Sequence, residues 1–146
     1  SLRHYPSSPL LGACTASWRG EKILLARRSV NPNAGTWAMP GGLVEVGERV
    51  EDAARREVKE ETRLTVERLA FNRFFEIIMR DSTARVERHY VLAMFVALSP
   101  SGLAVAGDDA AAVSWFTLDD LDTIPLTANT LELVQESRKF LPELGA

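Results

Sequence analysis

Apolar and polar residues alternate in several runs along the chain, and these runs predict most of its strands. Residues 10–18 and 22–27 flank the turn Arg19-Gly20-Glu21 and are expected to pair as strands. Residues 65–79 are rich in β-branched and aromatic side chains, so we expect a long strand there, bulged where the alternation slips. Residues 87–98 are apolar on both faces, which is typical of a central strand covered on both sides. A further strand is expected at 113–116.

Two segments have the composition of helices. Residues from about Arg49 to Thr62 contain good helix formers and no Gly or Pro. A second helix is expected near the C-terminus, where Asn129 can serve as the cap and Glu132 can complete a capping box. Residues 117–121 are expected to form a short helical turn. Strands combined with few helices predict an α+β fold in which helices cover a sheet.

The chain has 146 residues, the size of one domain, which we expect to span residues 9–146 behind a loose N-terminal arm at 1–8. No apolar run approaches ~18 residues, so no membrane span is expected. The only cysteine, Cys14, lies in an apolar run and is expected to be a buried thiol, which fits a reducing cytoplasm. The net charge of −3 argues against an extended nucleic-acid surface.

The helix at 49–62 departs from an ordinary amphipathic pattern in its second half. At about 100° per residue, acids enter its apolar stripe, and buried like charges persist only when they are paired or bound to a cation. Closely spaced carboxylates offer hard oxygen ligands suited to Mg²⁺ or Mn²⁺. A solvated Glu/Lys face is the alternative, and the interruption of the apolar stripe disfavours it. The stripe consists of Val50, Ala53, Ala54, Glu57, Glu61 and Leu64, with Glu60 beside it.

A glycine-punctuated loop at 41–48 precedes these acids, and loop and helix together resemble the Nudix box. That pattern is Gly, five residues, Glu, seven residues, then Arg-Glu-aliphatic-any-Glu-Glu-any-Gly-aliphatic. Here it begins at Gly42, continues through Glu48 and ends with Arg56-Glu57-Val58-Lys59-Glu60-Glu61-Thr62-Arg63-Leu64. Arg63 stands where the family has Gly. We expect Arg63 to take a left-handed conformation at the helix end, at a cost of roughly 1 kcal/mol.

The resemblance implies the Nudix fold, a mixed β-sheet sandwiched between α-helices, and a divalent cation, Mg²⁺ or Mn²⁺, as cofactor. It gives catalytic roles to Glu48, Arg56 and Glu57, with Glu57 as a metal ligand or as the base that activates water. The implied metal ligands are the carbonyl of Gly42 and the carboxylates of Glu57, Glu60 and Glu61. Relatives often carry a further acid before the strand that contains Trp115. Asp109 is the candidate there, with a plain surface loop as the alternative.

Substrate contacts are expected from Arg27 and Trp37. Arg27 corresponds to a substrate-contacting arginine of MutT-type relatives, and a solvated charge at a strand end is the alternative. Trp37 could stack on a base, although a wedge between loop and sheet is favoured. MutT-type enzymes carry Glu directly before the residue that corresponds to Trp115. This chain has Ser114 there, which weakens a strict MutT assignment.

Three functions are compatible with the resemblance. The favoured one is hydrolysis of the diphosphate linkage in a nucleoside diphosphate sugar such as ADP-ribose. The second is a nucleoside triphosphate pyrophosphohydrolase that clears damaged nucleotides of the 8-oxo-dGTP type. The third is a non-catalytic Nudix module that senses a nucleotide, which the intact Glu57, Glu60 and Glu61 disfavour. The expected partner is a small-molecule nucleotide, and the oligomeric state is left open, a homodimer included.

Overall fold

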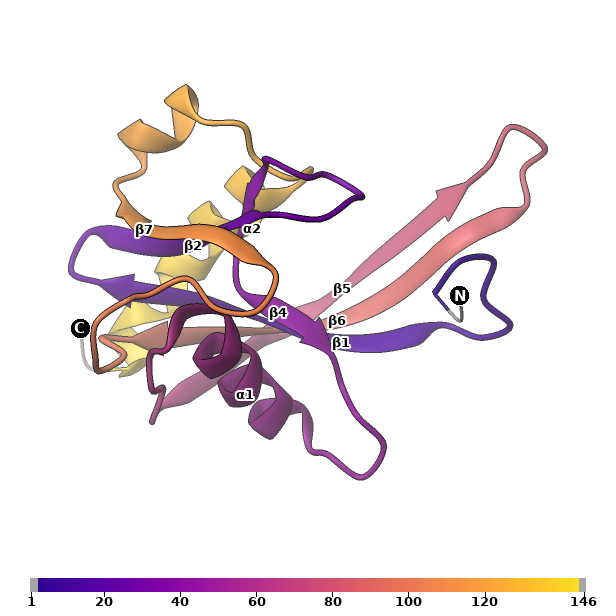
Figure 1. Ribbon diagram of the computed structural model, residues 1–146. Coiled ribbons are helices and arrows are strands. Elements are labelled where there is room, and N and C mark those ends of the chain that lie inside the picture. Colours follow the sequence, from indigo (N-terminus) through magenta and orange to yellow (C-terminus); the bar gives the residue numbers. More distant parts are fainter. Residues whose placement is uncertain (1–2, 145–146) are drawn as a thin grey trace.

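The computed structural model describes residues 3–144, which form a seven-stranded mixed sheet between two helices (Figure 1). This confirms the predicted α+β sandwich. The strands are β1 (Leu10–Arg19), β2 (Lys22–Arg28), β3 (Trp37–Ala38), β4 (Gly41–Leu43), β5 (Leu69–Arg80), β6 (Val86–Leu98) and β7 (Ala110–Phe116). The helices are α1 (Val50–Thr62) and α2 (Thr130–Ser137), with 3-10 segments η1 (Asp119–Thr123) and η2 (Arg138–Leu144).

β1 and β6 run parallel at the centre of the sheet, with residues 10–18 opposite residues 90–98. β2 and β4 pair antiparallel with β1, and β7 pairs antiparallel with β2. Along β6, Ala93 and Phe95 join the cluster that contains α1, whereas Met94 and Val96 join the cluster that contains α2. The prediction of a central strand covered on both sides is therefore confirmed.

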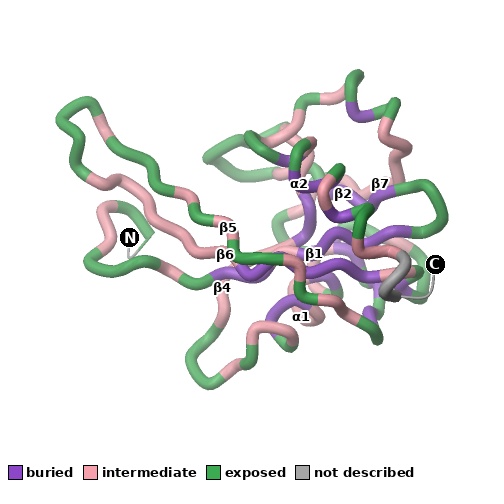
Figure 2. The backbone as a smooth tube through the Cα atoms, turned by 180° about the vertical axis from the view of Figure 1, so that it is seen from behind, coloured by how far each residue is buried: buried purple, intermediate pink, exposed green. Residues whose placement is uncertain are grey.

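The core lies on both faces of this central pair of strands, and Figure 2 shows its buried backbone concentrated there. On one face, α1 packs through Ala53, Ala54 and Val58. On the other face, α2 packs against the fully buried Trp18, whose indole N–H donates to Ser137 Oγ at 3.0 Å. Because Trp18 fills the space under α2 and its only polar atom is satisfied, it fixes α2 on the sheet.

Two local expectations need correction. The predicted strand at 65–79 begins only at Leu69, because Thr65 pairs with Ser101 in an isolated bridge that ties the end of α1 to the β6–β7 loop. The bulge predicted in this strand is confirmed between Phe71 and Arg73. Asn129 does precede α2, but its side chain makes no cap hydrogen bond. With φ of 69° the residue is left-handed, whereas a capping side chain needs an extended backbone.

The N-terminal arm contacts the β5–β6 hairpin. The N–H of Tyr5 donates to the Glu87 carbonyl at 2.8 Å, and His4 pairs with the Glu87 carboxylate at 3.0 Å. Residues 1 and 2 lie outside the described residues, and the arm boundary at residue 8 stays a prediction. Between residues 3 and 144, no helix has the length and apolar character needed to cross a membrane.

Candidate active site

Gly41 and Gly42 bring β4 into close contact with both β1 and α1. In the antiparallel register, Gly41 lies opposite Cys14 and Gly42 opposite Ala13. A Cβ on Gly41 would lie 2.5 Å from Cys14 Sγ and 2.6 Å from the Ala13 carbonyl oxygen. A Cβ on Gly42 would lie 2.5 Å from the Glu57 carboxyl group. Only glycine allows this approach, so the paired glycines place the backbone of β4 against the acids of α1.

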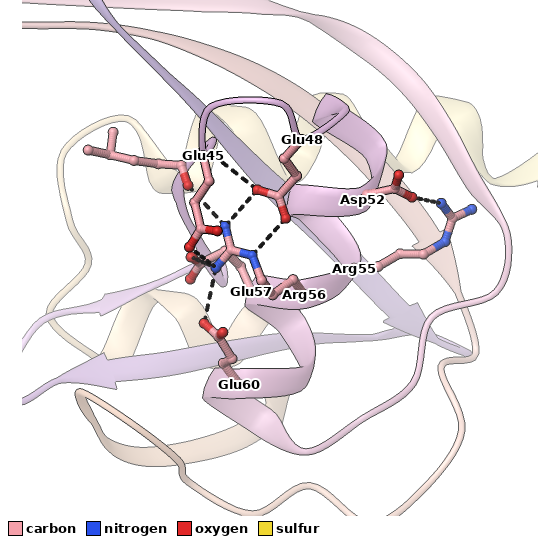
Figure 3. A network of polar contacts seen from close by, with 8 residues as sticks. Glu45, Glu48, Asp52, Arg55, Arg56, Glu57 and Glu60 are labelled. Atoms are coloured by element: carbon pink, nitrogen blue, oxygen red, sulfur yellow. Dashed lines mark hydrogen bonds and ion pairs between the residues drawn. The ribbon is translucent and has the colours of Figure 1, made fainter.

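Arg56 connects α1 to the loop that precedes it. Its Nε and Nη2 donate to the two carboxylate oxygens of Glu48 at 2.8 and 2.9 Å, and Nη2 also donates to the Leu43 carbonyl at 3.1 Å (Figure 3). Glu48 further accepts the N–H of Glu45 at 3.1 Å. The hydrogen bonds from Arg56 hold the pKa of Glu48 at about 2, and Glu48 in turn raises the pKa of Arg56. This two-point pair fixes the loop against the helix.

The remaining guanidinium nitrogen of Arg56 faces the acids further along α1. Nη1 donates to Glu57 Oε1 at 2.8 Å and to Glu60 Oε2 at 3.2 Å. The Glu57 side chain is 14% exposed, whereas that of Glu60 is 41% exposed. Burial raises the pKa of Glu57, although its hydrogen bond to Arg56 opposes the shift. One arginine therefore orients three carboxylates of the box.

Among the described acids, Glu61 has the pKa that is raised most. Burial, followed by the charge of the neighbouring Glu57, raises the pKa of Glu61 from 4.5 to about 8. The N–H of Gly41, which donates to Glu61 Oε2 at 3.0 Å, and the charge of Arg28 both act in the opposite direction. Glu57 and Glu61 are therefore two desolvated carboxylates that repel each other, and of the two only Glu57 forms an ion pair with Arg56.

A hard divalent cation fits this donor set, because it would offset both the desolvation and the repulsion. Within residues 3–144, no three acidic, His or Cys side chains converge tightly enough to form a complete metal site. Arg56 occupies the space between Glu48, Glu57 and Glu60 and holds Glu60 toward itself. Glu57 and Glu61 are thus the prearranged part of the site, and Glu60 lies on the same helical turn.

Asp108 is an acid that the sequence reasoning passed over. It lies close enough to raise the pKa of both Glu57 and Glu61. The β6–β7 loop brings it there by bonding to the end of α1, because Val105 N–H donates to the Thr62 carbonyl at 2.9 Å and Gly107 N–H to the Glu61 carbonyl at 3.0 Å. These bonds satisfy carbonyls that a helix end leaves unpaired.

Asp109, the predicted ligand, is the neighbour of Asp108 in this loop. Its carbonyl accepts hydrogen bonds from the N–H of Ser29, at 3.0 Å, and from the Ser29 hydroxyl. The structure thus shows Asp109 joining the β6–β7 loop to the end of β2, and a metal role for its side chain stays a prediction. The sequence signal that favoured Asp109 was its distance from Trp115, which does not separate it from Asp108.

Arg27 and Trp37 lie together on the face of β2 that points away from α1. Arg27 is opposite Trp37 in the β2–β3 register, and its guanidinium carbon lies 5.7 Å from the centre of the indole ring. Trp37 packs on the α2 core and meets Phe116 edge-on at 4.9 Å. This packing agrees with a wedge between loop and sheet. Substrate contact by Arg27 or Trp37 stays a prediction.

Arg28 lies on the other face of β2, which is the face of α1. Side chains alternate along a strand, so Arg28 shares a face with Leu24, which packs against Val58 of α1. Arg28 is half-buried, donates to the Pro32 carbonyl at 2.9 Å, and lowers the pKa of Glu61. Of the two neighbouring arginines of β2, Arg28 is therefore the one whose charge lowers the pKa of Glu61.

Arg63 ends α1 in the left-handed conformation that the sequence predicts, with φ of 65°. Its N–H donates to the Lys59 carbonyl at 2.9 Å, as expected for a helix that ends on such a residue. A Cβ on Gly107 would lie 3.1 Å from the guanidinium of Arg63. The Arg63 side chain therefore lies against the β6–β7 loop at Gly107, the residue before Asp108.

The NUDIX domain family model matches residues 11–144 of this chain. The chain belongs to the Nudix family. Among curated Nudix relatives, the ADP-ribose pyrophosphatase of Methanocaldococcus jannaschii is 38% identical over 103 residues, which cover 70% of this chain and 59% of that protein. The chain therefore spans about three fifths of the length of this relative.

Solved Nudix structures share the fold. The MutT NUDIX hydrolase from Burkholderia pseudomallei superposes with a TM-score of 0.78 at 32% identity, and the match covers 89% of this chain and 98% of that one. The NUDIX domain of Shewanella oneidensis NrtR, solved with ADP ribose, gives a TM-score of 0.80 at 23% identity and covers 92% and 90% of the two chains. The second likeness concerns the fold alone.

Proposed function

We propose that this Nudix chain hydrolyses the diphosphate linkage of a nucleoside diphosphate derivative, with nucleoside diphosphate sugars such as ADP-ribose as the favoured substrates. The observation that carries the proposal is the pair of desolvated carboxylates, Glu57 and Glu61, held against β4 at the glycine pair. Burying such a pair lowers the stability of the fold when no cation is bound. A cation that also binds phosphate would offset this loss. The 38% identity to an ADP-ribose pyrophosphatase supports the substrate class.

In this proposal, Glu57, Glu60 and Glu61 hold Mg²⁺ or Mn²⁺, together with the carbonyl of Gly42. When bound, the cation supplies positive charge for the reacting diphosphate and lowers the pKa of a bound water. Arg56 fixes one oxygen of Glu57 at 2.8 Å, which orients that carboxylate either as a ligand or as the base that takes a proton from the attacking water. Asp109 is kept as a further candidate ligand, and Asp108 is added to it.

The proposed reaction also defines the products and the groups of the substrate that the protein would contact. Hydrolysis adds water across one P–O–P linkage, so one phosphorus–oxygen bond forms and another breaks. ADP-ribose would give AMP and ribose 5-phosphate. Arg28 lies on the face of β2 that packs against α1, and its charge lowers the pKa of Glu61. Its proposed role is to balance the negative charge of the diphosphate. Arg27 and Trp37 are kept as candidate contacts to the rest of the nucleotide.

A nucleoside triphosphate pyrophosphohydrolase of the damaged-nucleotide type is the second candidate. The 32% identity to a MutT NUDIX hydrolase, over 98% of that chain, favours it. Ser114 before Trp115 weighs against it, because MutT-type relatives carry Glu there. The box contacts only the diphosphate in both reactions, so the acid cluster does not distinguish them. A nucleotide-sensing module is the remaining alternative.

The deciding experiment is a chromatographic screen for nucleoside monophosphate release, with Mg²⁺ or Mn²⁺, over nucleotide sugars, dinucleotides and triphosphates, including ADP-ribose and 8-oxo-dGTP. We expect turnover of ADP-ribose to exceed that of every triphosphate. Glu61→Gln should reduce kcat by at least about a hundredfold, because the metal would lose a ligand. The matched control is Glu67→Gln, an exposed acid beyond the end of α1. Full activity in Glu61→Gln would refute the catalytic assignment, and nucleotide binding without turnover would favour the sensor.

The remaining expectations accompany this proposal. The substrate is a small-molecule nucleotide, without an extended nucleic-acid surface. The cytoplasmic location inferred from the single cysteine stays a prediction. A homodimer also stays a prediction, and the β5–β6 hairpin offers a surface for it.

A further inference from the structure

β5 forms an outer edge of the sheet. The strand order ends with β6 and then β5, and in the part of the chain that the structure describes no strand pairs with the outer side of β5. The strand is 12 residues long, and Figure 1 shows its hairpin with β6 extending well beyond the rest of the molecule. A long edge presents a row of open backbone N–H and C=O groups, which favours pairing with another strand.

The exposed face of this edge is partly apolar. Side chains alternate along the regular part of β5, so Phe74, Glu76, Ile78 and Arg80 share one face, and all four are exposed. Phe74 is 54% and Ile78 47% exposed. Proteins that keep an edge free usually blunt it with charges, prolines or short strands. Here the two charges have opposite signs and alternate with the two apolar side chains, so they can pair with a second strand as well as exclude one.

The hairpin is held in place from its other side. Tyr5 O–H donates to Asp81 at the turn at 2.7 Å, and the guanidinium carbon of Arg85 lies 4.2 Å from the centre of the Tyr5 ring. The Tyr5 N–H donates to the Glu87 carbonyl. The N-terminal arm thus anchors the tip and the β6 side, which leaves β5 as a prearranged edge. A partner that pairs there would need little ordering of the strand.

We propose that a second copy of this chain pairs antiparallel along β5, with the two-fold axis at Ile78. In this register, Ile78 meets Ile78 of the second copy, and Glu76 lies opposite Arg80 of the second copy. The symmetry creates this acid–base pair twice, as an isologous interface requires. Directly opposite residues share a face, so the exposed face becomes complementary in both charge and hydrophobicity.

Neighbouring registers lack this match. An axis at Ile77 would place Glu76 opposite Ile78 of the second copy, and an axis at Met79 would place Ile78 opposite Arg80 of the second copy. An axis at Glu76 would bring two like charges together. The charge pattern of the strand therefore specifies both the occupant, a copy of itself, and the register. This inference does not depend on the proposed reaction.

The first test is the molar mass of the full chain by light scattering and sedimentation across the micromolar range. We expect a dimer in the wild type and a folded monomer in Ile78→Lys, because the side chain is 47% exposed. The variant should melt like the wild type diluted below its dissociation constant. The matched control is Leu103→Lys, which changes an 81% exposed leucine outside the strands and should stay dimeric. A wild type that is monomeric throughout, or a dimer that survives Ile78→Lys, would overturn the proposal.

The second test uses charge reversal to examine the register. Glu76→Arg and Arg80→Glu should each raise the dimer dissociation constant by about tenfold, because each places like charges opposite one another twice. The double variant restores opposite charges and should recover the wild-type dissociation constant. Ile78→Cys should also form a disulfide-linked dimer on oxidation, and Leu103→Cys should not. A double variant as weak as the single ones would refute this register.

Discussion

Glu61 should make the metal-free protein less stable as the pH rises, and Glu61→Gln should remove this effect. The folded-state pKa of about 8 lies above the unfolded value of 4.5, because burial and Glu57 disfavour the charged form. A group whose pKa is raised on folding contributes stability that is fully present below pH 4.5. That contribution is lost as the pH rises to about 8.

The magnitude follows from the two pKa values. Each pKa unit corresponds to about 1.4 kcal/mol, so the interval from 4.5 to about 8 amounts to a loss of about 5 kcal/mol in the free energy of unfolding. Glutamine keeps an oxygen that can accept the Gly41 N–H, but it adds an amide that needs partners, at a cost of about 1–2 kcal/mol. At pH 9, Glu61→Gln should therefore be more stable than the wild type by about 3 kcal/mol.

The assay is urea unfolding in EDTA at several pH values between 4 and 9. Glu60→Gln is the matched control, because its side chain is 41% exposed and loses less hydration on folding. Added Mg²⁺ should reverse the order, since it stabilises the wild type by mass action and the variant much less. A Glu61→Gln protein that is less stable than the wild type at pH 9 in EDTA would refute this reasoning.

Substitutions at four further positions test the elements around this acid. Arg63→Gly should raise the free energy of unfolding by about 1 kcal/mol in urea melts, because it relieves a left-handed residue, whereas Arg63→Ala keeps the strain and should not. Gly41→Ala should cost about 1–3 kcal/mol in the same melts, because its Cβ meets the backbone of β1. The three atoms nearest to a Cβ at Gly42 all belong to the Glu57 carboxyl group, so Gly42→Ala should displace that side chain, cost less stability than Gly41→Ala and lose turnover. Arg56→Gln should lower Tm with and without metal, since it releases Glu48 from its two-point pair.

Much of the sheet and the position of α1 could be predicted, because both depend on local periodicity. The same periodicity could also have separated Arg27 from Arg28. Leu24 packs against α1, so a residue four positions further along the strand lies on the same face. The choice of Arg27 came from the family resemblance alone. The alternation along β2 carried the better signal for which arginine faces the acids.

The approach of Asp108 could not be read from the sequence. It depends on hydrogen bonds from Val105 and Gly107 to the carbonyls at the end of α1, which lie more than forty positions earlier in the chain. Asn129 shows a second limit of sequence-based prediction. Its residue type suits a helix cap, but its left-handed backbone does not allow the cap hydrogen bond. Local composition identifies residue types, whereas long-range contacts decide their geometry.

The acids of the box divide into two kinds, and the division follows from their partners rather than from their residue type. Glu48 receives two hydrogen bonds from Arg56, and its pKa falls to about 2. Glu61 receives one backbone N–H beside another carboxylate, and its pKa rises to about 8. A carboxylate with a lowered pKa is already satisfied by the fold and stabilises it. One with a raised pKa is held in place at a cost, and a cation is what would relieve that cost. We therefore propose that Glu48 and Arg56 position the loop, and that Glu57 and Glu61, together with Glu60, hold the metal.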